Sequence, residues 1–294
     1  MRILQLSDTH LERTPGPNRH GVDATESLQL MLAELRHQPG VDMVLVTGDI
    51  ADDGAVESYA TARELFGRFA AELGVPLFFT TGNHDDRAAF GKVLGSGHLA
   101  ADGSERADMV MSSPEGERAA VSSVRGYRII TMDSLVPGEV FGLLSNAQLD
   151  WLNEVLRVQA DRGTVVAFHH PPISMDVDVQ RAFGLRNPRT LAEVLRGSDV
   201  RVVLTGHFHL QLLGVLAAVP VWVTPGVISR TDLTAPQGTE RVVRGGAASL
   251  IEVGGAMGPM FHTLHARDPR AHETLYELDE QQVDKLIDER GTAR

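Results

Sequence analysis

The stretch Val75-Pro-Leu-Phe-Phe-Thr-Thr-Gly-Asn-His-Asp85 joins a short apolar run to three consecutive polar side chains. The run predicts a buried strand that ends near Gly82, where we expect the backbone to turn sharply. Asn83, His84 and Asp85 would then stand in the crevice beyond the strand, where open α/β sheets bind ligands. An amide oxygen, an imidazole and a carboxylate offer a metal ligand, a proton donor and a group to orient that donor. An Asx-turn with an exposed histidine is the alternative interpretation of this tetrapeptide taken alone.

The same arrangement recurs at four other apolar runs of the chain. The runs end in Ser7-Asp-Thr-His10, Gly48-Asp49, His169-His170 and Gly206-His-Phe-His209. Because the carboxyl ends of parallel strands meet at one edge of a sheet, we expect these side chains to converge. A single histidine or Gly-Asp pair is weak evidence of a site, but five such strand ends together indicate one.

Strands alternate with amphipathic helices along the first half of the chain. This alternation predicts a parallel sheet with helices on both faces and right-handed crossovers. The expected strands cover residues 2–7, 42–47, Val75–Phe79, Tyr127–Met132, Gly163–Phe168 and Val200–Thr205, with antiparallel strands at Val215–Val223 and Ala247–Val253. The expected helices cover about Ala24 to Arg36, residues 60–73, Gln148–Leu156, Pro188–Arg196 and Leu275 to Arg294, and the span from Arg87 to Val124 is expected to be mostly irregular.

The spacing of the polar residues suits a pair of cations. In Asp8-x-His10 and His207-x-His209, residues two apart on an extended strand would point the same way and reach one cluster. Two cations about 3.5–4 Å apart need a bridging ligand, and a carboxylate at a strand end such as Asp49 suits that position.

Composition narrows the classes of protein and partner. The chain has 294 residues, no cysteine and a formal net charge of −12. Without thiolates, a metal would be held by oxygen and imidazole nitrogen. The negative charge argues against nonspecific nucleic-acid binding. No segment has the pattern of a signal peptide or of a membrane span, so we expect a cytoplasmic protein with no membrane partner.

The polar residues at the five strand ends, taken in chain order, resemble the motifs of the calcineurin-like metallophosphoesterase superfamily. The resemblance covers residues 8 to 209, and every block is intact. A further pattern, Asp133-Ser134 followed by Leu135-Val-Pro-Gly138, Gly142-Leu-Leu-Ser145 and Gln148-Leu-x-Trp151, resembles the bacterial branch of class III cyclic nucleotide phosphodiesterases and glycerophosphodiesterases. The resemblance implies an αββα sandwich of two mixed sheets flanked by helices, with a dinuclear metal site at the carboxyl ends of the strands.

The resemblance also implies a role for each site residue. One metal would be held by Asp8, His10 and His209, the other by Asn83, His169 and His207, and Asp49 would bridge them. The choice of His169 over His170 follows only from the resemblance, because spacing leaves the two open. His84 would contact the phosphoryl oxygen or leaving group, and Asp85 would orient it. The metals implied are two divalent or mixed-valence ions of the iron, manganese, zinc or cobalt type.

The implied activity is hydrolysis of a phosphodiester by in-line attack of a hydroxide shared by the two metals. The substrate class is a 3′,5′-cyclic nucleotide, with cyclic AMP favoured and a 5′-nucleotide as product. The alternatives are a glycerophosphodiesterase or broad-specificity phosphoesterase using the same metals, and a metal-binding regulatory protein without turnover.

One main domain is expected, because no internal repeat or low-complexity linker interrupts the chain. We assign residues 1–270 to the metallophosphoesterase domain and residues 271–294 to a helical extension that could contact a second copy in a homodimer.

Overall fold

Three parallel strands near the start of the chain form the centre of the first sheet. The computed structural model describes residues 1–291. The sheet has the order β15-β14-β1-β2-β3-β4. Its strands are β1 (Arg2–Leu6), β2 (Met43–Thr47), β3 (Leu77–Thr80), β4 (His98–Leu99), β14 (Ala247–Glu252) and β15 (Met260–His265). Strand β1 pairs parallel with β2 but antiparallel with β14, so the sheet is mixed.

The second sheet faces the first and is also mixed. It has the order β10-β11-β9-β8-β7-β6-β5. Its strands are β5 (Met109–Ser112), β6 (Arg118–Val124), β7 (Tyr127–Thr131), β8 (Thr164–Ala167), β9 (Val200–Thr205), β10 (Leu212–Leu216) and β11 (Val219–Val223). Strands β7, β8, β9 and β11 are parallel to their neighbours within this group, and the outer pairs are antiparallel.

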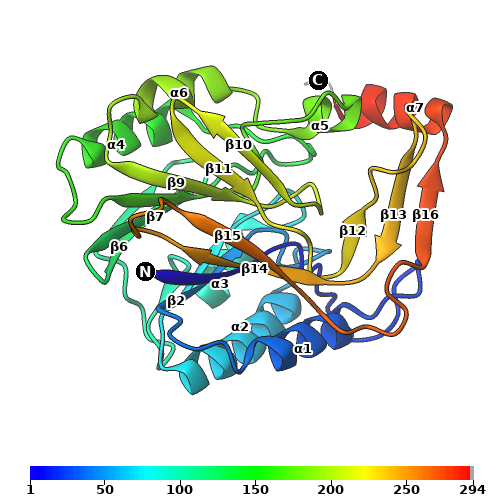
Figure 1. Ribbon diagram of the computed structural model, residues 1–294, viewed down its shortest axis with the longest axis horizontal. Coiled ribbons are helices and arrows are strands. Elements are labelled where there is room, and N and C mark those ends of the chain that lie inside the picture. Colours follow the sequence, from blue (N-terminus) through cyan, green and yellow to red (C-terminus); the bar gives the residue numbers. More distant parts are fainter. Residues whose placement is uncertain (292–294) are drawn as a thin grey trace.

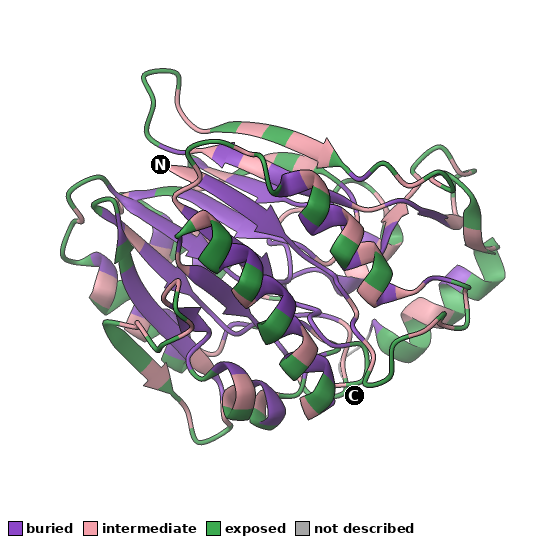
Figure 2. Ribbon diagram, turned by 90° about the horizontal axis from the view of Figure 1, so that it is seen from below, coloured by how far each residue is buried: buried purple, intermediate pink, exposed green. Residues whose placement is uncertain are grey.

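Helices cover the outer face of each sheet (Figure 1). They are α1 (Ala24–Leu35), α2 (Val56–Leu73) and α3 (Arg87–Leu94) beside the first sheet, and α4 (Asn146–Leu156) and α6 (Pro188–Leu195) beside the second. The apolar stripe of each helix faces its sheet, and Figure 2 shows α1 and α2 buried on that side and exposed on the other. The period-2 alternation of β1 separates Leu4, which packs on the helices, from Ile3, which packs between the sheets.

The structure therefore confirms the αββα sandwich and corrects the simpler expectation of one sheet covered by helices on both faces. The inner face of each sheet packs on the other sheet instead. Gln5 also joins the two sheets, because its amide nitrogen donates to Thr47 Oγ1 at 3.0 Å and to the carbonyl of Thr205 at 2.9 Å. This link lies just below the strand ends that carry the polar residues.

A third, smaller sheet stands at one end of the sandwich. It has the order β12-β13-β16 and consists of β12 (Ser229–Thr231), β13 (Glu240–Arg244) and β16 (Thr274–Leu278), followed by α7 (Glu280–Arg290). The short helix α5 (Asp178–Phe183) packs beside α7. Within residues 1–291, no helix is long and apolar enough to cross a bilayer.

Several expected elements differ from those observed. The span Arg87 to Val124 contains α3 and strands β4 to β6 rather than mostly irregular structure, because pairing with β3 and β7 supplies order that its mixed composition does not signal. Residues 275–278 form strand β16 instead of helix, since they pair with β13. The segment Val215–Val223 is split into an antiparallel hairpin at Ala217 and Ala218, and its second strand runs parallel to β9. Residues 292–294 of the expected helix lie outside the described residues.

His98 hydrogen-bonds across the two sheets, and we expect its burial to make the free energy of unfolding depend on pH. Its ring nitrogens lie 2.8 Å from Ser122 Oγ and 2.8 Å from Thr131 Oγ1, and burial lowers its pKa to about 3. The unfolded chain therefore binds this proton below about pH 6.5 while the folded chain does not, so stability falls as the pH falls. At pH 5 we expect a loss of about 2 kcal/mol relative to pH 8 from this residue.

Urea unfolding of the wild type and of His98→Gln at pH 8 and pH 5, both with a chelator present, measures this loss. The wild type should lose about 2 kcal/mol more than the variant between the two pH values. Equal losses would show that His98 does not titrate between folded and unfolded states.

Candidate metal centre

Six of the seven expected metal ligands, all except Asn83, belong to groups of side chains that lie close together at one edge of the sandwich. The side chains of these groups come from the loops after β1, β2 and β3 of the first sheet and after β8 and β9 of the second. Their ligand atoms form overlapping groups within 4.8 Å, and these groups are Asp8–His10–His209, His10–Asp49–His84, Asp8–Asp49–His169 and His169–His170–His207. These carboxylates and imidazoles therefore lie close together, at an edge that belongs to two sheets rather than one, and their assignment as metal ligands stays a prediction.

The backbone of these loops is unusual. Among residues 1–291, nine non-glycine residues have positive φ, and five of them are expected ligands: Asp8, His10, Asp49, His207 and His209. Such conformations cost of order 1–2 kcal/mol each for residues with a Cβ and collect at functional sites. Asp8 and His10 lie beyond the end of β1 with positive φ, so the expectation that they belong to an extended strand is wrong. His207 and His209 likewise turn toward different groups of ligands.

Gly82 is required by close approach rather than by its backbone angle. Its φ is not among the positive values, which corrects the expected reason for a glycine here. A Cβ at this position would lie 2.3 Å from Asp49 Oδ1. Glycine therefore lets the loop after β3 lie against the Asp49 carboxylate, which accepts a hydrogen bond from the His84 N–H at 2.9 Å.

The first group of ligands joins Asp8, His10 and His209. His209 Nε2 lies 3.4 Å from Asp8 Oδ1 and 3.2 Å from His10 Nε2. The opposite ring nitrogens are already bonded, because His10 Nδ1 lies 3.0 Å from Asp52 Oδ1 and His209 Nδ1 lies 2.9 Å from Ser229 Oγ. When these outer nitrogens carry the protons, two lone pairs and a carboxylate oxygen face one point, which is the donor set that a divalent cation takes.

Within residues 1–291, two buried atoms of the second group form no hydrogen bond. His169 Nδ1 lies 2.7 Å from the carbonyl of Thr47, which makes it the protonated nitrogen, and its Nε2 faces Asp49 Oδ2 at 3.2 Å. His169 Nε2 and Asn83 Oδ1 are both buried without a hydrogen bond. An unpartnered buried polar atom costs roughly 1–3 kcal/mol, and these two are the atoms expected to bind the second metal. The residues present therefore fit a metal pair.

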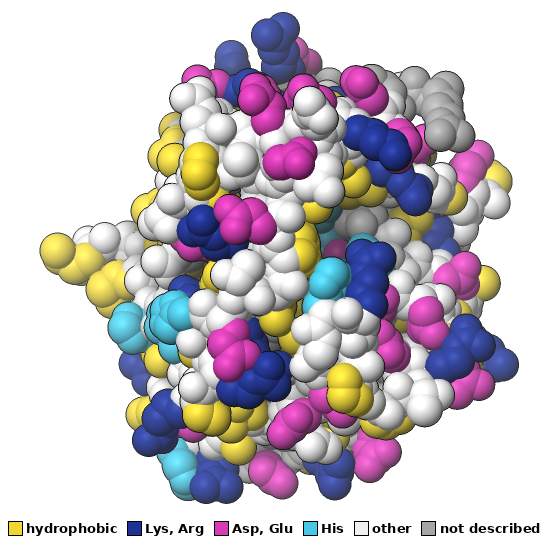
Figure 3. Space-filling model, turned by 90° about the vertical axis from the view of Figure 1, so that its right-hand side faces the viewer, with side chains coloured by type: hydrophobic (Ala, Val, Ile, Leu, Met, Phe, Trp, Pro, Cys, Tyr) yellow, Lys and Arg dark blue, Asp and Glu magenta, His cyan; other side chains and the backbone are white. Residues whose placement is uncertain are grey.

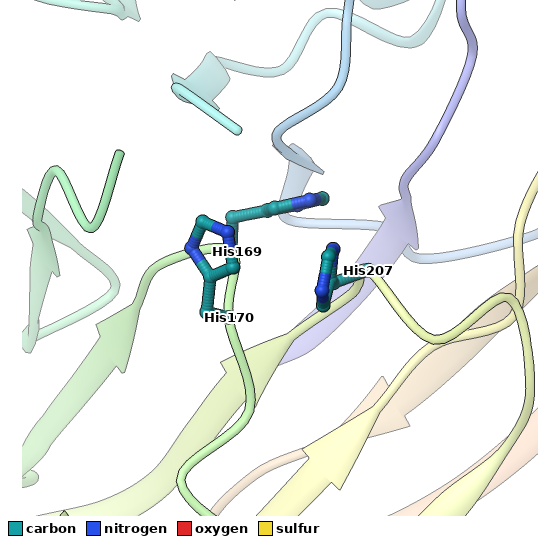
Figure 4. Close-up of side chains that lie close together, drawn as sticks. All are labelled: His169, His170 and His207. Atoms are coloured by element: carbon teal, nitrogen blue, oxygen red, sulfur yellow. The ribbon is translucent and has the colours of Figure 1, made fainter. Parts of the chain in front are cut away.

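His170 is the neighbour that spacing could not exclude. Its Nδ1 lies 2.8 Å from Ser134 Oγ and its Nε2 lies 3.1 Å from the carbonyl of Val140, so both nitrogens are engaged. Among residues 1–291, the His207 ring hydrogen-bonds through Nε2 alone, to the carbonyl of Phe183 at 3.0 Å, which leaves Nδ1 open. Figure 4 shows the His169 and His170 rings turned in different directions, with their planes 84° apart. This hydrogen bonding favours His169 over His170 as the ligand.

The charges of the site hold its carboxylates ionised. Burial raises the pKa of Asp8, but the His209 and His169 imidazoles outweigh burial and lower the pKa to about 2. Burial lowers the pKa of His169, but Asp49 and Asp8 outweigh it and raise the pKa to about 9. A cation that binds His169 would therefore displace a proton.

Asp52, rather than Asp85, orients His84. The His84 ring has Nδ1 3.2 Å from the carbonyl of Asp52 and 3.3 Å from its Oδ1. Asp85 is buried and points away, because its carboxylate accepts the Tyr59 hydroxyl and three backbone N–H groups of Gly82, Ile50 and Ala51. The prediction that Asp85 orients His84 is wrong, since this carboxylate instead fixes the loops after β2 and β3.

Sequence reasoning missed Asp52, which lies three positions after Asp49. It stands beside Asp53, and nothing in the spacing separates the acid that faces His84 from the one that pairs with Arg13. Burial lowers the pKa of His84, but Asp49 and Asp52 outweigh it and raise the pKa to about 10. The imidazole at the mouth of the site therefore carries a proton at neutral pH.

Comparison with known proteins agrees with this geometry. Residues 1–211 match the family model described as calcineurin-like phosphoesterase. The chain is 37% identical over 241 residues to a cAMP/cGMP dual specificity phosphodiesterase of Mycobacterium tuberculosis, which covers 81% of this chain and 71% of that protein. It is 35% identical over 240 residues to a probable cyclic nucleotide phosphodiesterase of Rhodococcus erythropolis, which covers 81% of this chain and 75% of that protein.

A solved structure shares the fold at much lower sequence similarity. It is a purple acid phosphatase from yellow lupin seeds, similar with a TM-score of 0.58 and 12% identity over 96% of this chain and 55% of that chain. The family-model match ends before the third sheet, which begins at Ser229.

Proposed function

Since the chain belongs to the calcineurin-like phosphoesterase family, we propose that it hydrolyses 3′,5′-cyclic nucleotides to 5′-nucleotides, with cyclic AMP as the favoured substrate. The observation that carries the proposal is the pair of ligand groups on either side of Asp49, with His169 Nε2 and Asn83 Oδ1 left open between them. Relatives named as cyclic nucleotide phosphodiesterases, at 35% and 37% identity, support the substrate class.

The proposed metal ligands are those that the family resemblance implies, and the hydrogen bonds of the histidine rings support them. Asp8, His10 and His209 would hold one ion, Asn83, His169 and His207 the other, and Asp49 both. Two divalent cations bound there would neutralise charge on the phosphoryl oxygens and lower the pKa of an attacking water. Iron, manganese, zinc and cobalt all suit a nitrogen and oxygen donor set, so we propose a pair of ions from this group.

His84 is proposed to protonate the leaving group. It is the exposed histidine of the site, and its Nδ1 lies 3.3 Å from Asp52 Oδ1. As the bond from the attacking oxygen to phosphorus forms and the bond from phosphorus to O3′ breaks, the His84 proton would pass to O3′. The product is then a 5′-nucleotide with a free 3′-hydroxyl, and no covalent enzyme intermediate is needed.

A substrate panel tests this function directly. The protein loaded with manganese is incubated with cyclic AMP, cyclic GMP, glycerophosphocholine and p-nitrophenyl phosphate, and products are quantified by chromatography. We expect 5′-AMP from cyclic AMP with the largest kcat/KM of the panel, and chelator-treated protein should be inactive. A larger kcat/KM for glycerophosphocholine or the monoester would replace the proposal with one of the alternative phosphoesterases, and no turnover of any substrate would favour a regulatory protein.

Two further expectations stay predictions. A homodimer and a cytoplasmic location are proposed from the sequence, and sedimentation velocity and cell fractionation respectively would test them. The division into residues 1–270 and an extension from residue 271 also stays a proposal, and β16 of that extension pairs with β13 of the preceding part.

A further inference from the structure

A large cavity separates the metal centre from the third sheet. Its volume is about 780 Å³, which lies within the range of small-molecule sites. His84, His207 and His209 line one end, and residues of β13, β16 and α7 line the other. In Figure 3, which faces the third sheet, histidine atoms are visible in a hollow near the middle of the surface. A substrate whose phosphate lies at the metal centre would therefore extend its other end toward this sheet.

The third sheet presents one face to the cavity. Glu240 pairs with Leu278 and Val242 pairs with Tyr276, and all four residues line the cavity. Because successive side chains of a strand alternate, Glu277 points away from the cavity. Its carboxylate lies 3.1 Å from a guanidinium nitrogen of Arg241, a residue that also lines the cavity. Glu240 and Tyr276 are thus diagonal neighbours on the same face.

Glu240 is the unpaired acid of this face. Its side chain is partly buried, yet nothing within residues 1–291 donates a hydrogen bond to it or forms an ion pair with it. Most other acids near the cavity are engaged, as Asp232 is with Arg241 and Asp176 with Arg181. A partly buried carboxylate without a partner loses hydration for no compensating bond, so its position favours a ligand that donates one.

An aromatic surface lies beside Glu240. The His20 and Tyr276 rings have centroids 4.8 Å apart with planes tilted by 37°, and both line the cavity. Rings at this separation and tilt are partly stacked on each other, so the pair can form a wall of the cavity but does not enclose a ligand as a cage does. A planar base stacks on such a wall, whereas a quaternary ammonium group is usually enclosed by several ring faces.

The third sheet is fixed to the metal centre by hydrogen bonds. Ser229 Oγ lies 2.9 Å from His209 Nδ1, and Thr231 Oγ1 donates to the carbonyl of Phe208 at 3.0 Å. Both residues belong to β12, which pairs with β13. The distance from the metal ligands to Glu240 is therefore set by one continuous hydrogen-bonded sheet.

We propose that this face binds the nucleoside half of the substrate, with Glu240 accepting a hydrogen bond from the exocyclic amine of the base or from the ribose 2′-hydroxyl, and Tyr276 packing against the base. The inference rests on the proposed function and names its specificity-determining residue. A carboxylate here repels phosphate, so it also keeps the charged end of the substrate at the metals. Glu240 and Tyr276 lie beyond residue 211, outside the part of the chain that the family model matches, whereas His20 lies within it.

Steady-state kinetics of Glu240→Ala provide the test, with Glu277→Gln as the matched control from the opposite face of the same sheet. We expect kcat/KM for cyclic AMP to fall about 10- to 100-fold in Glu240→Ala, the loss typical of a polar base contact. Hydrolysis of bis(p-nitrophenyl) phosphate, which lacks a nucleoside, should stay within about twofold. Glu277→Gln should match the wild type on both substrates, and Glu240→Ala should keep its melting temperature because it removes an unpaired group.

Two substrate analogues identify the donor. Cyclic purine riboside monophosphate lacks the 6-amino group, and the 2′-deoxy analogue of cyclic AMP lacks the hydroxyl. Glu240→Ala should cause no further loss on whichever analogue lacks the group that Glu240 binds. Calorimetric titration of the metal-loaded protein with 5′-AMP and with inorganic phosphate gives a readout independent of turnover, and the variant should weaken only 5′-AMP.

The outcomes separate this inference from the proposed function. A wild type that binds 5′-AMP but releases none from cyclic AMP would refute the function, while weaker 5′-AMP binding in Glu240→Ala would still support the nucleoside wall. Unchanged 5′-AMP binding in Glu240→Ala, an equal loss on bis(p-nitrophenyl) phosphate, or a selective loss on glycerophosphocholine would overturn the inference.

Discussion

Asp49→Ala should lose most of its bound metal and reduce kcat/KM for cyclic AMP by roughly three orders of magnitude, since bound cations contribute several kcal/mol to charge stabilisation. Asp49 faces imidazoles of both proposed metals, as Asp8 also does, and the family resemblance assigns the bridging position to Asp49. Its Oδ2 lies 3.2 Å from His169 Nε2 and 3.7 Å from His10 Nε2, and these two imidazoles belong to different proposed metals. Elemental analysis after gel filtration should give about two ions per wild-type chain and fewer than one per variant.

Two further variants test whether metal loss in Asp49→Ala comes from the missing carboxylate or from a disturbed loop. Asp49 has φ of +46°, which aspartate and asparagine tolerate better than alanine, so Asp49→Asn keeps the backbone and the bond to the His84 N–H while removing the charge. Asp53→Asn changes an acid of the same loop that pairs with Arg13 instead of facing the ligands, and it should keep both metals. Full metal content and rate in Asp49→Asn would refute the bridging position.

The strand ends could be predicted because each is a local pattern. An apolar run that stops at a glycine and continues into Asp, Asn or His needs no long-range information, and such runs are β2, β3 and β9 in the structure. Their convergence also followed from a general rule, because parallel strands present their carboxyl ends at one edge. The resemblance added the division into two sheets, which alternation of strands and helices does not contain.

Contacts between distant segments could not be read in the same way. Strand β14 enters the first sheet beside β1 although about 240 residues separate them, and β16 becomes a strand only because β13 lies next to it. Glu240 illustrates the consequence for function. In the sequence it is one acid of a charged segment, and only the pairing of β13 with β16 places it on the cavity face while Glu277 points outward.

The choice between Asp52 and Asp85 failed for a related reason. Asp85 is adjacent to His84 in the chain, and adjacency suggested that it orients the ring. In the structure the bonds of Asp85 go to the Tyr59 hydroxyl and to backbone N–H groups, while the loop after β2 brings Asp52 to the imidazole. Side chains of consecutive residues in a turn point in different directions, so the orienting partner of a catalytic group is set by a neighbouring loop.

His84→Ala should keep both metals and yet lose roughly 10²- to 10⁴-fold in kcat on cyclic AMP, the contribution typical of a general acid. The hydrogen bond from His84 to Asp49 comes from the backbone N–H, which alanine retains, and the His84 ring nitrogen Nδ1 contacts Asp52. The leaving group decides how much the proton matters. O3′ of a cyclic nucleotide departs as a strongly basic alkoxide, whereas p-nitrophenolate departs without a proton donor. The variant should therefore lose far less on bis(p-nitrophenyl) phosphate than on cyclic AMP.

Asp52→Asn separates a proton-donating His84 from one that only positions the substrate. Asparagine keeps the Asp52 carbonyl that lies 3.2 Å from His84 Nδ1 but removes the carboxylate charge at 3.3 Å. If His84 donates a proton, removal of the Asp52 charge destabilises the protonated imidazole. The variant should then show the same selective loss on cyclic AMP, but smaller, at about 10-fold. If His84 only positions the phosphate, both substrates should lose activity equally in His84→Ala. Asp52→Asn keeps a side-chain oxygen that can accept from His10 Nδ1, so at the metal content of the wild type, checked by elemental analysis, it should then be nearly silent. Asp85→Asn disturbs a buried carboxylate that fixes the loops after β2 and β3, so it should lower the melting temperature and affect both substrates alike. A selective loss on cyclic AMP in Asp85→Asn, without one in Asp52→Asn, would return the orienting role to Asp85.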